Sequence, residues 1–205
     1  MRRRGLMANK LYDAQVEYIE TDGEAFIDTG VIMDSNLKFD ISFYEPVTSV
    51  GNIVFGGRTN THKLEFAVGN DSGMWAWRYR TVTKSKDFDN YQHSGNYIVN
   101  NIPYPYLINF TCDETFHYLN SSATAYFTLN LSFTIFASHA SDGVSVHIPG
   151  VRLYYCKLYN GDNLVRDFIP VRKKGKGYLY DKVTDALFGN AASVGAFTYG
   201  NDVTQ

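Results

Sequence analysis

The sequence predicts one all-β domain, either a sandwich or a barrel. Short segments with alternating apolar and polar residues recur along the chain, and glycine- and asparagine-containing turns separate them. No window of about a dozen residues has the apolar spacing of an amphipathic helix without a turn breaker. The 16 Tyr and 14 Phe also favour strands. A length of 205 residues suits a single domain of this class.

The first predicted strands show the alternation clearly. Residues 15–20 (QVEYIE) alternate, and residues 25–29 (AFIDT) follow a TDGE turn. Residues 37–44 (LKFDISFY) alternate over four steps, as expected for a half-buried strand of an antiparallel sheet. We expect four residues of this strand to point into the core: Leu37, Phe39, Ile41 and Phe43.

Further strand-like segments continue to the middle of the chain. They read NIVFGG, KLEFAV, MWAWRY, YLINFT, FHYL, ATAYFTL and SFTIFA, with turn formers such as GND, SDG, NGD and KKGKG between segments. Residues 84–105 are the least regular, and we interpret them as long loops that contain one short strand near residues 97–99. The segment LVRDFIPV alternates again near the C-terminus.

The net charge and the N-terminal residues narrow the kinds of partner and the location that we expect for this protein. The 19 basic and 21 acidic residues give a net charge of −2, whereas a general nucleic-acid-binding domain should be basic, so we expect no nucleic-acid partner. No apolar segment is long enough to span a bilayer. The basic start, MRRRGLMA, lacks the apolar core of a secretory signal peptide, which predicts synthesis in the host cytoplasm without a signal peptide.

The two cysteines do not form a disulfide framework. Cys112 and Cys156 each lie in an apolar, strand-like segment. Buried free thiols are the favoured interpretation, and one bridge between them is the alternative.

Metal and cofactor signals are absent from the sequence. The five histidines have no metal-ligand spacing, and no CxxC pair occurs, so we predict no metal centre and no cofactor. Three aspartates lie in turns whose oxygens could hold calcium, although each segment is equally a hairpin turn: Asp71, Asp142 and Asp162.

No catalytic motif is recognisable either. The N-terminal acids lack the spacing of the paired carboxylates of sandwich glycoside hydrolases, and we interpret them as solvated or turn residues: Glu17, Glu20, Asp22 and Glu24. A nucleophile elbow, a phosphate-binding loop and a dinucleotide fingerprint are also missing. The sequence therefore predicts a protein that is not an enzyme.

One aromatic segment could bind a ligand. In MWAWRYR, residues Trp75, Trp77 and Tyr79 share one face of a strand. That face could be part of the core, or it could be a platform on which sugar rings stack. Three further tyrosines near the irregular region could extend such a platform: Tyr91, Tyr104 and Tyr106.

Both ends of the chain resemble a known family. Residues 16–30 (VEYIETDGEAFIDTG) are similar to VEYIESTGTQYIDTG, the opening of LamG-like jelly-roll proteins. Residues 153–197 contain LVRDFIPV, GYLYD and a small turn ending in Phe, which resemble the family's closing pattern. FGGR and SFTIFA resemble its middle. The sequence departs from the family pattern in two places: it has TDGEAF in place of STGTQY, and an extra AASV in the last turn.

This resemblance implies an antiparallel two-sheet jelly-roll sandwich of the concanavalin A-like superfamily, whose first and last strands pair in one sheet. Related proteins of gut-bacterial tailed phages and prophages look like virion surface components. The resemblance therefore implies a non-enzymatic head or tail fibre or decoration subunit on the virion surface, forming homo-oligomers and binding a host-surface glycan. A bacterial lectin-like carbohydrate-binding module and, less favoured, a glycoside hydrolase are the alternatives.

The first eleven residues predict a tail or docking arm, and residues 12–205 the jelly-roll domain. Consecutive arginines are costly to bury unpaired, while nearby apolar residues can anchor an arm to a partner, here another virion protein. The arm residues are Arg2, Arg3, Arg4, Leu6 and Met7.

Overall fold

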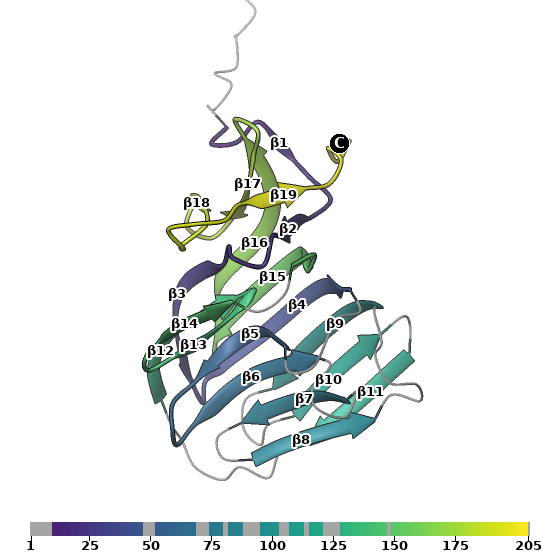
Figure 1. Ribbon diagram of the computed structural model, residues 1–205, viewed down its shortest axis with the longest axis vertical. Helices are drawn as coiled ribbons and strands as arrows, with labels where there is room; N and C mark the ends of the chain where they lie inside the picture. The colour runs from purple at the N-terminus through teal and green to yellow at the C-terminus, as the bar shows by residue number, and fades with distance from the viewer. Residues whose placement is uncertain are drawn as a thin grey trace, which may run out of the picture.

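The computed structural model describes residues 10–46, 52–68, 74–79, 82–87, 95–102, 107–112, 115–120, 128–146 and 149–204. Side chains are described for residues 10–46, 53–66, 95–100, 128–145 and 149–204. Within the described residues the chain is all strand and turn, without a helix, and two curled sheets pack face to face (Figure 1). The prediction of an all-β sandwich is confirmed.

The larger sheet has eleven strands. Its main path contains β11 (Thr115–Asn120), β10 (Leu107–Cys112), β9 (Gly95–Ile102), β4 (Leu37–Glu45), β15 (Arg152–Asn160), β16 (Asn163–Lys173), β17 (Lys176–Asp181) and β18 (Ala186–Phe188), in that order. Three short strands join it beside this path: β1 (Ala14–Gln15), β2 (Ile19–Thr21) and β19 (Phe197–Tyr199).

The smaller sheet has eight strands. Its main path contains β14 (Gly143–Val146), β13 (Ala137–Ala140), β5 (Asn52–Arg58), β6 (Lys63–Val68), β7 (Met74–Tyr79) and β8 (Val82–Asp87). The remaining two strands are β12 (Thr128–Ile135), which pairs with β5, and β3 (Ile27–Asp34), which pairs with β12.

The region predicted to be mostly loop contains longer strands than expected. β8 extends to Asp87, and β9 has eight residues instead of a short segment near residues 97–99. The sequence of β9, GNYIVNNI, is rich in asparagine, which is depleted in strands. Pairing with β4 on one side and β10 on the other supplies ladder hydrogen bonds that override this local preference.

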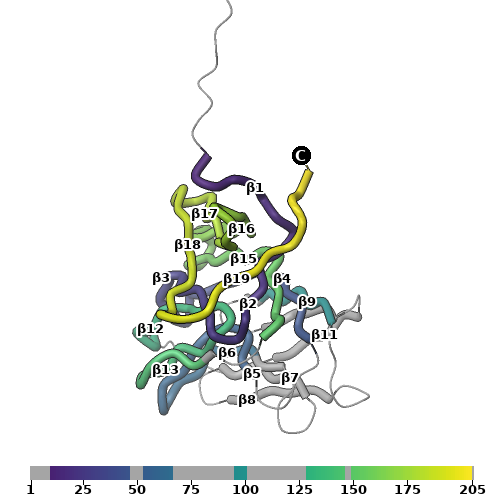
Figure 2. The backbone as a smooth tube through the Cα atoms, turned by 45° about the horizontal axis from the view of Figure 1, so that its top comes forward, coloured from purple at the N-terminus to yellow at the C-terminus, as the bar shows by residue number. Residues whose placement is uncertain are grey.

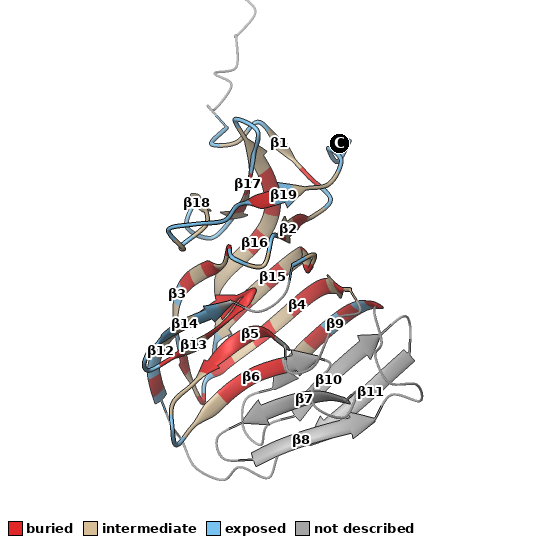
Figure 3. Cartoon of the chain, in the orientation of Figure 1, coloured by how far each residue is buried: buried red, intermediate tan, exposed pale blue. Residues whose placement is uncertain are grey.

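The core lies between the two sheets, where β4, β5 and β6 carry many of the buried residues (Figure 3). The predicted inward face of β4 is confirmed, because Leu37, Phe39, Ile41 and Phe43 are all buried. Phe39 packs edge-on against Phe55 with ring centroids 5.2 Å apart. Aromatic pairs at this distance add to the stabilisation from area burial alone.

Cys156 is a buried free thiol on β15, as expected, and burial raises its pKa. Cys112 is on β10, and β9 and β4 separate these two strands. Strands about 4.8 Å apart place the two positions roughly 14 Å from each other, beyond the reach of a disulfide.

Both ends of the described chain meet in a lobe formed by β1, β2, β16, β17, β18 and β19 (Figures 1 and 2). β2 pairs with β19 in register Glu20 to Thr198, which confirms that the first and last segments lie in one sheet. The Asp13 carboxylate accepts a 2.7 Å hydrogen bond from the amide of Lys174. Asp13 therefore belongs to the folded part of the chain.

Candidate functional site

The best-defined candidate site is the outer face of the larger sheet, on the side away from the core. Because side chains alternate along a strand, the residues between the buried ones on β4 point outward. The register of β4 with β9 and β15 then arranges the outward residues in rows. We define the outer face by ten residues: Asp40, Ser42, Tyr44, Asn96, Ile98, Asn100, Arg152, Tyr154, Tyr155 and Lys157.

Ser42 occupies the centre of this face. It lies opposite Ile98 on β9 and Tyr155 on β15. Ser42 is small and almost buried, whereas Ile98 is 44% exposed. Ser42 therefore projects less from the sheet than its two neighbours, the apolar Ile98 and the aromatic Tyr155.

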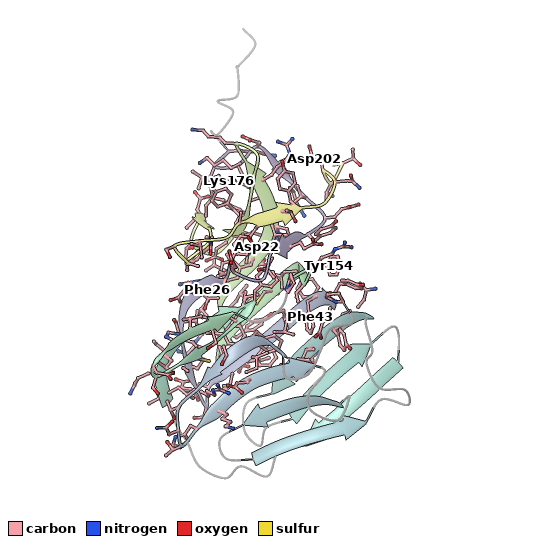
Figure 4. All side chains as sticks on the ribbon, in the orientation of Figure 1. Asp22, Phe26, Phe43, Tyr154, Lys176 and Asp202 are labelled. Carbon is pink, nitrogen blue, oxygen red and sulfur yellow. The ribbon has the colours of Figure 1, made fainter. Side chains whose placement is uncertain are left out.

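A β-bulge adds a second tyrosine to the same face. Leu153 pairs with Phe43 and Tyr155 pairs with Ser42, so Tyr154 is the extra residue of β15. A bulge inserts one residue and re-aims side chains, which explains how adjacent tyrosines can both serve one face. The Tyr154 hydroxyl donates a 3.0 Å hydrogen bond to Oδ1 of Asn96. Tyr154 stands where the sandwich meets the lobe (Figure 4).

Arg152 organises the end of the outer face nearest the lobe. Its guanidinium lies 4.6 Å from the ring centroid of Tyr18 and 5.3 Å from that of Tyr44. Its Nε donates a 2.6 Å hydrogen bond to Glu20, which raises the pKa of the arginine. Cation–π contacts and the ion pair together fix the orientation of Tyr44.

Tyr155 is fixed by a different contact. Its hydroxyl donates a 3.1 Å hydrogen bond to Oδ1 of Asp40. Burial raises the pKa of Tyr155, and the negative charge of Asp40 raises it further. The hydroxyl therefore stays protonated at neutral pH and remains a donor.

The outer face combines groups suited to a sugar. Half-buried tyrosines offer apolar ring surface, and Asn96 and Asn100 offer amide donors and acceptors. Tyr154 and Tyr155 already have fixed orientations, which reduces the entropy lost on binding.

The aromatic segment predicted as a platform lies on β7, and its side chains are outside those described. The backbone register pairs Trp77 with Phe66 and Tyr79 with Leu64. Directly opposite residues share a face of a sheet, and Phe66 and Leu64 are buried. The register thus places positions 77 and 79 opposite two buried residues of β6.

Other predicted site residues lie outside the described residues. These are Tyr91, Tyr104 and Tyr106 of the extended platform, and Arg2, Arg3, Arg4, Leu6 and Met7 of the docking arm. The glycan platform on β7 and the arm stay predictions.

The turn aspartates differ in their surroundings. Asp142 is exposed in the turn between β13 and β14, and Asp162 lies 3.8 Å from Nζ of Lys38. Asp71 lies outside the described residues. Where the structure is described, no group of three or more His, Cys, Asp or Glu side chains could hold a metal ion.

The N-terminal acids make structural contacts. Glu17 accepts a 3.1 Å hydrogen bond from the amide of Asn201, and Glu20 pairs with Arg152. Asp22 accepts hydrogen bonds from the amides of Glu24, Ala25 and Ala196. Each of these three acids therefore connects one part of the fold to another.

Sequence reasoning did not find the outer face. Its one local signal is the adjacent pair Tyr154–Tyr155 in RLYYCKLY, which breaks the alternation of a strand and is compatible with a bulge. The remaining members lie on three strands far apart in the chain, and only the register brings them together.

In comparisons with known proteins, no family model and no curated protein matches this sequence. Among the described residues, no helix is long and apolar enough to cross a membrane.

Proposed function

We propose that the chain is a non-enzymatic surface protein of a phage virion that binds a host-surface glycan through the outer face. In this proposal the two sheets form a jelly roll of the concanavalin A-like type, and the protein is a fibre or decoration subunit of the head or tail. The observation that carries the binding function is that one face holds three tyrosines of fixed orientation, Tyr44, Tyr154 and Tyr155, with Asn96 beside them.

The virion context rests on the resemblance of residues 16–30 and 153–197 to phage-associated LamG-like proteins. The fold is compatible with it, because both of these segments contribute to the lobe and pair with each other there. In the proposed arrangement, Arg2, Arg3, Arg4, Leu6 and Met7 attach the lobe end to another virion protein or to further copies of the chain. The outer face of β4, β9 and β15 would then be available to the host surface.

Binding to defined glycans tests the proposal. The intact protein would be applied to an array of capsular and lipopolysaccharide glycans from gut bacteria, and each hit would be measured by calorimetry. We expect Tyr154→Ala to weaken binding about tenfold or more, as for loss of a stacking aromatic residue worth roughly 1–3 kcal/mol.

The matched control is Tyr180→Ala, which removes a half-buried tyrosine from the lobe instead of the outer face. It should leave glycan binding unchanged. Binding that is lost equally in both variants, or no binding to any glycan of the array, would overturn the glycan-binding part.

A bacterial lectin-like module is the second candidate, because the same outer face would serve it equally. The two are separated by genetic context and by location. Capsid or tail genes beside this gene, and the protein in purified particles, support the virion assignment. Its presence only on bacterial cells supports the lectin-like module.

A further inference from the structure

The lobe contains a hollow that the proposed glycan-binding face does not use. Its volume is about 290 Å³, near the lower end for small-molecule sites. The walls come from the start of β17, from β19 and from the loop of residues 189–196. The lining residues that carry the argument are Lys176, Tyr178, Gly189, Asn190, Ala192 and Ser193.

Small residues keep the hollow open. A Cβ atom added at Gly189 would come within 3.0 Å of Cε1 of Tyr178, so the loop backbone lies directly against the tyrosine ring. Ala192 and Ser193 continue this wall with short side chains. Larger residues at positions 192 and 193 would reduce the space, and any side chain at position 189 would press on the ring of Tyr178.

The loop is held in place by the side chain of Asn190. Its Oδ1 accepts hydrogen bonds from the amides of Phe26 and Ala192, at 3.2 and 2.9 Å. Its Nδ2 donates to the carbonyls of Val194 and Gly195, at 2.7 and 3.1 Å. A single side chain thus fixes both ends of the loop, and the hollow is formed before any ligand arrives.

The chemistry of the lining favours a ligand with a negative charge. Lys176, which Figure 4 labels in the lobe, is its one charged residue. It is exposed and makes no ion pair with any described residue. Tyr178 contributes ring surface and a hydroxyl, and Ser193 contributes a second hydroxyl. Asp22, which lies behind Gly195, does not line the hollow, and three backbone amides bond to its carboxylate.

From these features we infer that the hollow binds one carboxylate-bearing sugar residue, such as a uronic acid. The Lys176 ammonium pairs with the carboxylate, the ring of Tyr178 contacts the apolar side of the sugar, and the Ser193 hydroxyl bonds to a sugar hydroxyl. This site is separate from the outer face, which consists of other residues on β4, β9 and β15.

Titration with methyl glucuronide tests the inference, with methyl glucoside as the neutral match. Amide chemical shifts of the intact protein would be followed by NMR. We expect glucuronide to shift the signals of residues 176–178 and 189–197, and glucoside to bind about two- to fivefold more weakly, as for the loss of a solvent-exposed ion pair.

Three variants assign the binding to the hollow. Lys176→Gln should weaken glucuronide binding about two- to fivefold, whereas Lys174→Gln, which changes an exposed lysine of the same hairpin outside the hollow, should leave it unchanged. Ala192→Phe should abolish binding by filling the space without a change in charge. Equal loss in the two lysine variants would indicate diffuse charge attraction and overturn the site.

Two further outcomes overturn the inference: equal affinity for glucuronide and glucoside, or shifts confined to residues outside the lobe. The Tyr154→Ala variant separates this site from the proposed function. It should bind glucuronide like the unmodified protein even if the outer face binds no glycan at all.

Discussion

The carboxylate of Asp22 accepts a 2.6 Å hydrogen bond from the amide of Ala196, although 174 positions separate the two residues. The same carboxylate accepts from the amides of Glu24 and Ala25, so it closes its own turn and binds the C-terminal loop at once. Figure 4 shows Asp22 between the sandwich and the lobe. This contact connects the first and last parts of the fold.

Asp22→Ala should lower the free energy of unfolding by about 1 kcal/mol, a charge-assisted contribution reduced by solvent screening. Burial opposes ionisation of Asp22, but backbone hydrogen bonds from Glu24, Ala196, Ala25 and Asp22 itself outweigh it and lower its pKa. A lowered pKa in the folded state adds stability above the unfolded value of 3.8, and this is lost as the pH falls through the folded pKa. Denaturant unfolding at several pH values measures both effects. Asp22→Asn, which keeps an acceptor, should lose less, and an unchanged stability in Asp22→Ala would contradict the prediction.

Glu45→Gln should stabilise the protein at neutral pH. Glu45 is 2% exposed, and its Oε2 has no hydrogen-bond partner among the described residues. Burial raises its pKa well above 4.5. The folded state then holds a proton that the unfolded chain releases, so stability falls by up to about 1.4 kcal/mol per pH unit between 4.5 and the folded pKa.

Urea unfolding from acid to neutral pH should show this slope in the unmodified protein and a flatter one in Glu45→Gln. The exposed Glu24→Gln is the control and should keep the slope. A glutamine variant that is equally destabilised at every pH would show that the carboxylate has a partner. Glu65, which is also buried, differs because Ser138 donates to it and Arg58 lies 3.7 Å away.

Phe39→Ala should cost about 3–5 kcal/mol of unfolding free energy, as for other buried phenylalanines. The ring is buried and contacts the rings of Phe55 and Phe133, at centroid distances of 5.2 and 5.9 Å. Lys38→Ala on the outward side of the same strand should change stability little, since its ion pair with Asp162 is exposed. Equal costs in the two variants, measured by denaturant unfolding, would refute the assignment of the faces.

Trp77→Ala separates the two interpretations of the β7 segment. The register with the buried Phe66 favours the core, so we expect a loss of about 3–5 kcal/mol in unfolding free energy. Thermal unfolding and glycan binding would be measured on the same preparation. An unchanged melting temperature with weakened glycan binding would instead establish the stacking platform.

Deletion of residues 1–11 should leave the fold intact and prevent assembly onto the virion partner. The contact of Asp13 with Lys174 and the pairing of β1 with β16 remain in the shortened chain. Incorporation into particles and oligomer size would be compared with the full chain, and association of the full chain should weaken with salt. The control for charge is a variant in which Arg2, Arg3 and Arg4 are all changed to Gln. Normal incorporation of the shortened protein would end the docking-arm proposal.

The sequence by itself determined the fold class and the inward face of β4. Alternation is a local property, since a strand repeats every two residues whatever its neighbours are, and Leu37, Phe39, Ile41 and Phe43 are buried as expected. The similar family patterns at both ends also predicted the pairing of the two ends, which β2 and β19 show.

The tertiary structure alone decided the outer face, the bulge at Tyr154, the clamp at Asp22 and the hollow beside Lys176. Each depends on which residues lie opposite one another across strands, as Ser42 lies between Ile98 and Tyr155. A one-residue shift of register would move every side chain of a strand to the other face. Periodicity along one strand fixes only which of its sides faces the core. Which residues of the partner strand lie opposite is selected by the packing of the whole core and by the turns that join the strands.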